Sequence, residues 1–159
     1  MLLSDSSSIT LAKKFYPEST SKEEIDLIQS QVYKIGSNII FFKAIPYPTM
    51  YSMTMIMDKI EQLSKEFKYF YHISDVQNVS DKGSAKLRNY VAERLNQINN
   101  LEAIVFIMDR NIIMRTVISF FVKMIPGKPY YIVKTLDEAI KKVDFLQNEN
   151  SRFLLTQCK

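Results

Sequence analysis

The chain contains little glycine, histidine and cysteine, and these shortages exclude several kinds of functional site. Its three glycines, Gly36, Gly83 and Gly127, lie too far apart in the sequence to form a glycine-rich phosphate-binding loop. One histidine, His72, and one cysteine, Cys158, cannot supply a zinc ligand set or an internal disulfide. We therefore expect no metal, no nucleotide bound through a glycine loop and no other cofactor.

Catalytic and membrane-spanning motifs are also lacking. No G-x-S-x-G motif accompanies His72, so no pair of nucleophile and base can be assembled, and we expect a non-enzymatic protein in which this histidine belongs to the core or a sheet face. No apolar run approaches the roughly 18 residues of a membrane span. The start, MLLSDSSS, does not resemble a secretory signal, and the scarcity of cysteine favours a cytoplasmic location.

Positive charge is concentrated in the last third of the chain. The formal net charge is +4, and from residue 110 onward nine Lys or Arg residues stand against four Asp or Glu residues. Such an excess can attract an acidic partner or an anionic membrane surface. The basic residues are more dispersed than in typical nucleic-acid sites, so we expect a solvated basic face and no nucleic-acid partner.

Hydrophobic spacing predicts alternating strands and helices over most of the chain. A short polar helix that ends at Gln29 is indicated by the S-x-x-E pattern at Ser21 and Glu24, and a turn at Gly36–Asn38 joins the first two strands. Beyond it, apolar residues at helical spacing alternate with apolar runs of strand length. The predicted strands are Val32–Ile35, Ile39–Phe42, Tyr69–Val76, Ala103–Met108 and Tyr130–Val133, and the predicted helices are Met50–Phe67, Leu87–Ile98, Arg110–Ile125 and Leu136–Val143.

This order, β-β-α-β-α-β-α-β-α, predicts an α/β fold. The sheet should be mostly parallel, or mixed, starting with a β-hairpin and continuing through crossover helices. We assign residues 31–147 to this domain and residues 148–159 to a C-terminal tail. Residues 1–30 are predicted to form an extension, as a short helix or as a flexible arm.

The spacing of these elements resembles the STAS-like fold of bacterial anti-sigma-factor antagonists, in the branch described as STAS/SEC14-like. The resemblance runs from about Val32 to Leu146. It is carried by the hairpin followed by a helix, the strands YFYHISDV and EAIVFIMDRN, and the ending KPYYIVKTLDEAIKKV. It implies a bacterial signalling module that regulates its targets by protein–protein contact.

In that family the loop before the second long helix carries a phosphorylated serine, in a sequence close to Asp-Ser-Ser-Gly-Leu. Aligned on Gly83, this chain has Ser80, Asp81, Lys82, Gly83 and Ser84, with an aspartate at the acceptor position. Three interpretations stay open: Ser80 or Asp81 caps the helix, Asp81 imitates a phosphate, or Ser80 or Ser84 is phosphorylated. These five residues are the predicted regulatory and partner-binding loop.

The predicted helix Arg110–Ile125 is apolar over about half of its circumference, which is wider than the stripe that a helix normally buries on a sheet. The surplus either covers a neighbouring helix or forms a homodimer contact, an apolar ligand pocket or a peripheral membrane contact. The candidate residues on this face are Arg110, Met114, Arg115, Ile118, Phe121 and Ile125. We expect a regulatory module with a protein partner, and a carrier of a small apolar or lipid-like ligand is the alternative.

Overall fold

The computed structural model describes residues 20–109 and 111–157 and contains one five-stranded sheet in the order β1-β2-β3-β4-β5. It begins with an antiparallel hairpin of β1 (Val32–Ile35) and β2 (Ile39–Lys43), as predicted. Gly36 takes a φ of +59° in the connecting turn, a conformation that disfavours side chains with a Cβ atom.

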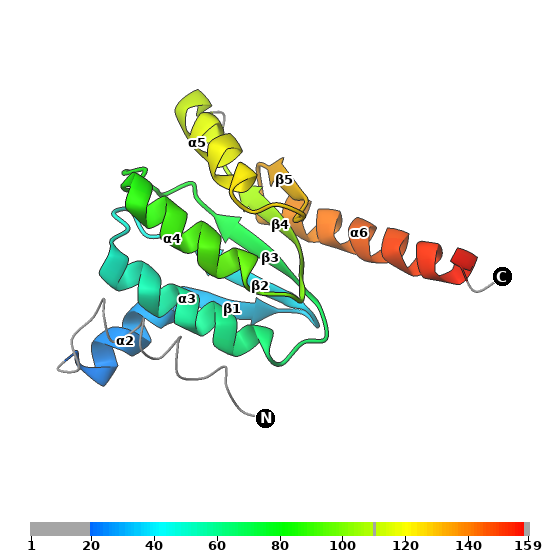
Figure 1. Ribbon diagram of the computed structural model, residues 1–159, viewed down its shortest axis with the longest axis horizontal. Coiled ribbons are helices and arrows are strands. Elements are labelled where there is room, and N and C mark those ends of the chain that lie inside the picture. The colour runs from blue at the N-terminus through cyan, green and yellow to red at the C-terminus, as the bar shows by residue number, and fades with distance from the viewer. Residues whose placement is uncertain (1–19, 110, 158–159) are drawn as a thin grey trace.

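The remaining strands, β3 (Phe70–Asp75), β4 (Leu101–Ile107) and β5 (Tyr130–Val133), add in parallel, so the sheet is mixed. Because each strand pairs with the next one along the chain, crossovers of one hand place the connecting helices on one face. Figure 1 shows α3, α4 and α5 together on this face. The α/β fold predicted from the sequence is thereby confirmed.

The helices begin at residues that satisfy their free backbone amides. A capping box of Thr49 and Ser52 caps the N-terminus of α3 (Met50–Ser64). The Ser84 hydroxyl caps α4 (Ala85–Asn96), and the Asn111 side chain caps α5 (Ile112–Lys123). Before β1 in the chain, the short helix α2 (Lys22–Gln29) begins after Ser21, whose hydroxyl accepts a hydrogen bond from the Glu24 amide, as predicted.

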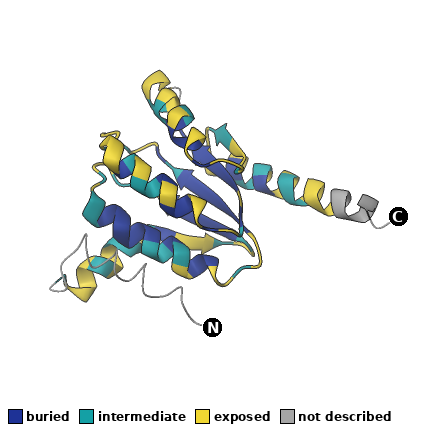
Figure 2. Ribbon diagram, viewed as in Figure 1, coloured by how far each residue is buried: buried dark blue, intermediate teal, exposed yellow. Residues whose placement is uncertain are grey.

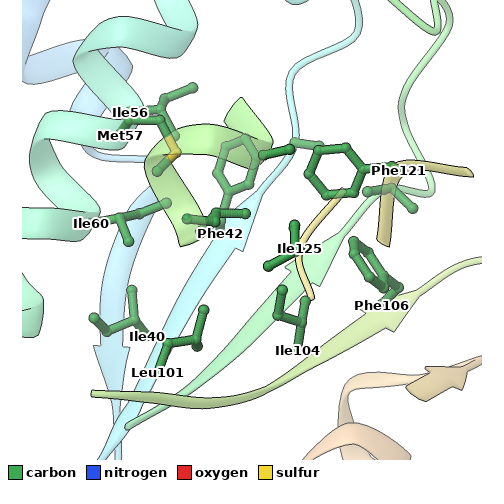
Figure 3. Close-up of a cluster of buried hydrophobic side chains, with 14 of the residues drawn as sticks. Ile40, Phe42, Ile56, Met57, Ile60, Leu101, Ile104, Phe106, Phe121 and Ile125 are labelled. Carbon is green, nitrogen blue, oxygen red and sulfur yellow. The ribbon is translucent and has the colours of Figure 1, made fainter. Parts of the chain in front are cut away.

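The larger part of the core lies between the sheet and α3, α4 and α5. Figure 3 shows side chains from β2, β4, α3 and α5 meeting there, with Phe106 and Phe121 packed edge to face at a centroid distance of 6.4 Å. In Figure 2, α4 is buried on its inner side and exposed on its outer side, whereas α3 is buried or half-buried along almost all of its length. The one-sided burial of α4 follows from the helical spacing of its apolar residues.

The opposite face of the sheet packs against α6 (Leu136–Gln157) through Ala139 and Val143. The Thr135 hydroxyl accepts a hydrogen bond from the Glu138 amide, as the T-x-x-E pattern predicts. The helix is longer than predicted and runs through residues 148–157, which we had set apart as a tail. Its C-terminal part extends beyond the sheet in Figure 1.

Candidate functional site

A cavity of about 130 Å³ lies where the parallel strands β2, β3 and β4 end, between them, the N-terminal half of α4 and the inner side of α5. The carboxyl ends of parallel strands are a common place for ligands in α/β proteins. Its walls are mainly apolar and come from six elements: β2, α3, β3, α4, β4 and α5. They include Phe42, Phe106, Leu87, Val91, Ile118 and Phe121.

Three charged residues, Asp81, Lys82 and Arg88, also line the cavity and are exposed or half-buried, so they mark its solvent side. The Arg88 guanidinium donates hydrogen bonds to the Lys82 carbonyl and, at 2.6 Å, to the Gly83 carbonyl. This side chain therefore holds the loop against the first turn of α4. The structure brings the predicted loop to the rim of a cavity.

The loop itself is held by backbone contacts to the segment after β2. The amides of Ser80 and Asp81 both donate to the Pro46 carbonyl, and the Asp81 carboxylate accepts from the Gly83 amide. The helix cap is Ser84, whose hydroxyl accepts from the Leu87 amide at 3.1 Å. The prediction that Ser80 or Asp81 caps α4 was therefore wrong, because the chain bends at Gly83 and starts the helix later.

Gly83 is needed for this bend. Its φ is +70°, and a Cβ atom on it would lie 2.9 Å from Cδ2 of Leu87, which lines the cavity. Gly127 has a similar φ of +77° but open space around it. The two glycines share a conformational requirement and differ in their surroundings.

We expect Gly83→Ala to lower the free energy of unfolding by about 1 kcal/mol more than Gly127→Ala. Both substitutions carry the cost of about 1–2 kcal/mol for a left-handed conformation, but only Gly83→Ala also displaces a packed leucine. Urea denaturation of both variants measures the difference. Equal losses would show that Leu87 moves aside freely and that the loop does not press on the cavity wall.

The apolar surface of α5 divides into two flanks with different surroundings. One flank faces inward: Ile118 and Phe121 are buried at the cavity, and Met114 and Val117 are half-buried in its wall. The other flank stays exposed, with Ile113 at 70% and Phe120 at 64%. Packing against the sheet and a neighbouring helix therefore buries only part of the wide apolar surface of α5.

The other residues proposed for this face have different positions. Ile125 follows the helix and is buried in the core, and the side chain of Arg115 is exposed and does not line the cavity. Arg110 lies outside the described residues. Of the six candidate residues for a ligand, dimer or membrane face, Met114, Ile118 and Phe121 line the cavity.

A second, smaller cavity of about 50 Å³ lies deeper, between the sheet and α3 and α4. It shares six lining residues with the first, so the two are adjacent, and His72 lies at the inner one while Ser74 lines both. The shared residues are Phe42, Met53, Ser74, Val91, Phe106 and Phe121.

His72 is a buried, neutral histidine. Burial lowers its pKa to about 4, despite the opposing effect of a hydrogen bond between Nδ1 and the Ile40 carbonyl at 3.2 Å. The prediction that His72 belongs to the core is confirmed, since the residue is buried and its Nδ1 is hydrogen-bonded. Nε2 has no hydrogen-bond partner among the residues that the structure describes.

Sequence reasoning missed Ser74 and Arg88 and gave His72 no part in a site. One signal was available for two of them. His72 and Ser74 alternate in a strand predicted to be buried, so both polar side chains point to the same sheet face. The role of Arg88 depends on where Gly83 turns the chain, which the sequence pattern did not locate.

The chain has no match among known protein families, curated proteins or solved structures at the level that would show a relationship. Within residues 20–109 and 111–157, no group of three or more His, Cys, Asp or Glu residues converges on a metal position. The described helices include none with the length and apolarity to cross a membrane.

Proposed function

We propose that this protein is a non-catalytic module that binds a small, mainly apolar ligand in the cavity between the sheet, α4 and α5. One observation carries the proposal: Asp81 and Lys82 of the predicted loop and the inward flank of α5, each proposed as functional from the sequence, line the same cavity. Of the two functions considered from the sequence, this geometry favours the ligand carrier.

The size and lining of the cavity support an apolar occupant. Its volume of about 130 Å³ is close to that of engineered protein cavities of roughly 150 Å³, which bind benzene. Pockets that are apolar inside and carry a few polar groups are the usual form of small-molecule sites. The polar residues Asp81, Lys82 and Arg88 at the opening would face the solvent side of a bound ligand.

We expect benzene to bind the full-length protein saturably, with the largest amide shifts in an NMR titration at the carboxyl ends of β2, β3 and β4 and in α4 and α5. Val117→Phe should abolish binding, because Val117 is half-buried in the cavity wall and the larger ring fills the space. Thr116→Phe is the matched control, since it adds the same ring at the next, exposed position outside the cavity. Equal binding by both variants, or none by the unmodified protein, would refute the proposal.

Native mass spectrometry of the purified protein, before and after denaturation, would identify a natural ligand. A mass difference lost on denaturation gives the mass of the ligand. A chain without added mass that captures a specific protein would instead support the second candidate function. An added phosphate would establish a modified serine, for which Ser80 and Ser84 are the candidates.

That second candidate is a regulatory module that binds a protein partner, or another copy of itself, through the exposed flank of α5. Ile112, Ile113 and Phe120 are exposed on this one helix, Met124 is exposed directly after it, and Lys123 lies over the Phe120 ring at 5.3 Å. Exposed apolar groups rimmed by polar residues are typical of contact surfaces. The two functions are compatible, because ligand binding would use the inward flank of α5 and partner binding its exposed flank.

We further propose that the domain belongs to the STAS-like fold. The hairpin at the start, the sequential strand order and the three crossover helices on one face support this assignment. Its regulatory function in bacterial signalling is a proposal on the same basis. Fold and activity are separate questions, so the ligand experiment does not depend on this assignment.

A further inference from the structure

Two polar atoms on buried residues of the cavity walls make no hydrogen bond within the described part of the chain. His72 is 3% exposed and Ser74 is 6% exposed, and among the described residues neither Nε2 of His72 nor Oγ of Ser74 makes a hydrogen bond. Every fully enclosed polar side-chain atom in the described part of the chain does have a partner. These two atoms therefore still touch the cavity space that both residues line.

The hydrogen-bonding roles of these atoms follow from their surroundings. The Ile40 carbonyl can only accept, so Nδ1 of His72 carries the proton, and in the neutral ring Nε2 is then an acceptor. The Ser74 hydroxyl can donate or accept. Together they match a group that donates one hydrogen bond and accepts another.

The spacing of the two residues suits one such group. Residues two apart in a strand lie about 6.6 Å apart on the same face. Two hydrogen bonds of about 2.8 Å that meet at one hydroxyl oxygen at an angle of about 110° span roughly 4.6 Å, a distance that two side chains leaning toward each other can reach. A single hydroxyl between them can form a hydrogen bond with both atoms. A carboxylate has no proton to donate, so its oxygen would be repelled by the lone pair of Nε2.

We propose that the ligand is a small apolar alcohol, with its hydroxyl held between His72 and Ser74 and its apolar body against Val91, Phe106 and Phe121. This inference rests on the proposed function and specifies the class of ligand for the same cavity. The hydroxyl enters first and the apolar body fills the outer cavity. His72 and Ser74 are then specificity-determining residues.

The test compares toluene, benzyl alcohol and benzoate, which share a ring and differ in one group, by NMR titration of the full-length protein. We expect benzyl alcohol to bind at least as tightly as toluene, although it is less hydrophobic, and benzoate not to compete. Ser74→Ala and His72→Leu should each lower the ratio of alcohol to toluene affinity about tenfold, since each removes one hydrogen bond. Ser37→Ala, at an exposed serine of the turn between β1 and β2 and outside both cavities, should leave the ratio unchanged.

Toluene binding serves as the internal control for an intact cavity in every variant. If toluene binds but the ratio is the same in Ser74→Ala and in the unmodified protein, then water alone occupies the polar positions and this inference is refuted, while the proposed function stands. Tighter binding of benzoate than of benzyl alcohol would also refute it, because the basic rim would then select the ligand. If none of the three ligands binds, the proposed function fails as well.

Discussion

Lowering the pH from 7 to 4 is expected to reduce the free energy of unfolding by about 3 kcal/mol through His72 alone. The pKa of this histidine is about 4 in the folded protein, chiefly because of burial, and about 6.5 in an unfolded chain. As the pH falls below 6.5 the unfolded state takes up a proton first, so folding becomes less favourable until the pH passes 4. The difference of about 2.5 pKa units corresponds to about 3 kcal/mol.

The measurement is urea denaturation at a series of pH values between 7.5 and 4. His72→Gln is the comparison, because glutamine keeps an amide that can donate to the Ile40 carbonyl but does not titrate. Carboxylates also titrate toward pH 4, and they do so equally in both proteins, so the difference between the two curves isolates His72. The chain has one histidine, which makes the assignment direct.

The two curves should diverge by about 3 kcal/mol over this range, most of it between pH 6.5 and 4. Parallel curves would mean that His72 charges in the folded state without cost, and so that water or an acidic group reaches Nε2. That result would also weaken the proposed alcohol site, which requires a neutral ring with a free acceptor.

The fold could be predicted from the sequence because its signals are local. Strand and helix positions follow from the spacing of apolar residues, and the helix starts at Ser21 and Thr135 from short capping patterns. The start of α4 was misplaced for a local reason too. Ser80, Asp81 and Ser84 are all good cap residues, and only the bend at Gly83 decides among them.

The candidate site was only half predictable, since it depends on which elements become neighbours. The loop and the flank of α5 each stood out in the sequence, yet nothing in the sequence placed them around one cavity. Helical spacing showed that α5 has two apolar flanks but could not tell which one would be covered. The sequence also could not show that Nε2 of His72 and Oγ of Ser74 have no hydrogen-bond partner among the described residues, because this depends on how the surrounding side chains pack.

Arg94 is a further residue that sequence spacing alone does not explain. It lies on the inner face of α4, among the apolar residues of that stripe, and is 3% exposed. Its guanidinium donates to Glu61 at 2.5 Å and to Asp58 at 2.8 Å, both on α3, and to the Tyr90 hydroxyl. Burial alone would lower its pKa, but the hydrogen bonds to the two carboxylates outweigh this and raise the pKa of Arg94.

We expect Arg94→Met to lower the free energy of unfolding by about 3 kcal/mol, measured by urea denaturation at pH 7. Methionine preserves much of the packing of the arginine stem, so the loss comes mainly from removing the guanidinium that both carboxylates share. Both are partly exposed, at 22% and 23% of their side-chain surface, and water can offset part of that cost. The expected loss therefore lies at the lower end of the range for a broken buried ion pair.

Two further variants separate the charge effect from general damage. Adding Asp58→Asn and Glu61→Gln to Arg94→Met should recover part of the loss, because neutral amides tolerate the absence of a cation and the three side chains act as one network. Lys34→Ala removes the exposed pair with Glu66, whose side chains are 44% and 48% exposed, and should cost at most about 0.5 kcal/mol. If Arg94→Met lowers the free energy of unfolding no more than Lys34→Ala does, then apolar packing holds α3 and α4 together. In that case the buried arginine contributes little to the stability of the helix pair beside the cavity.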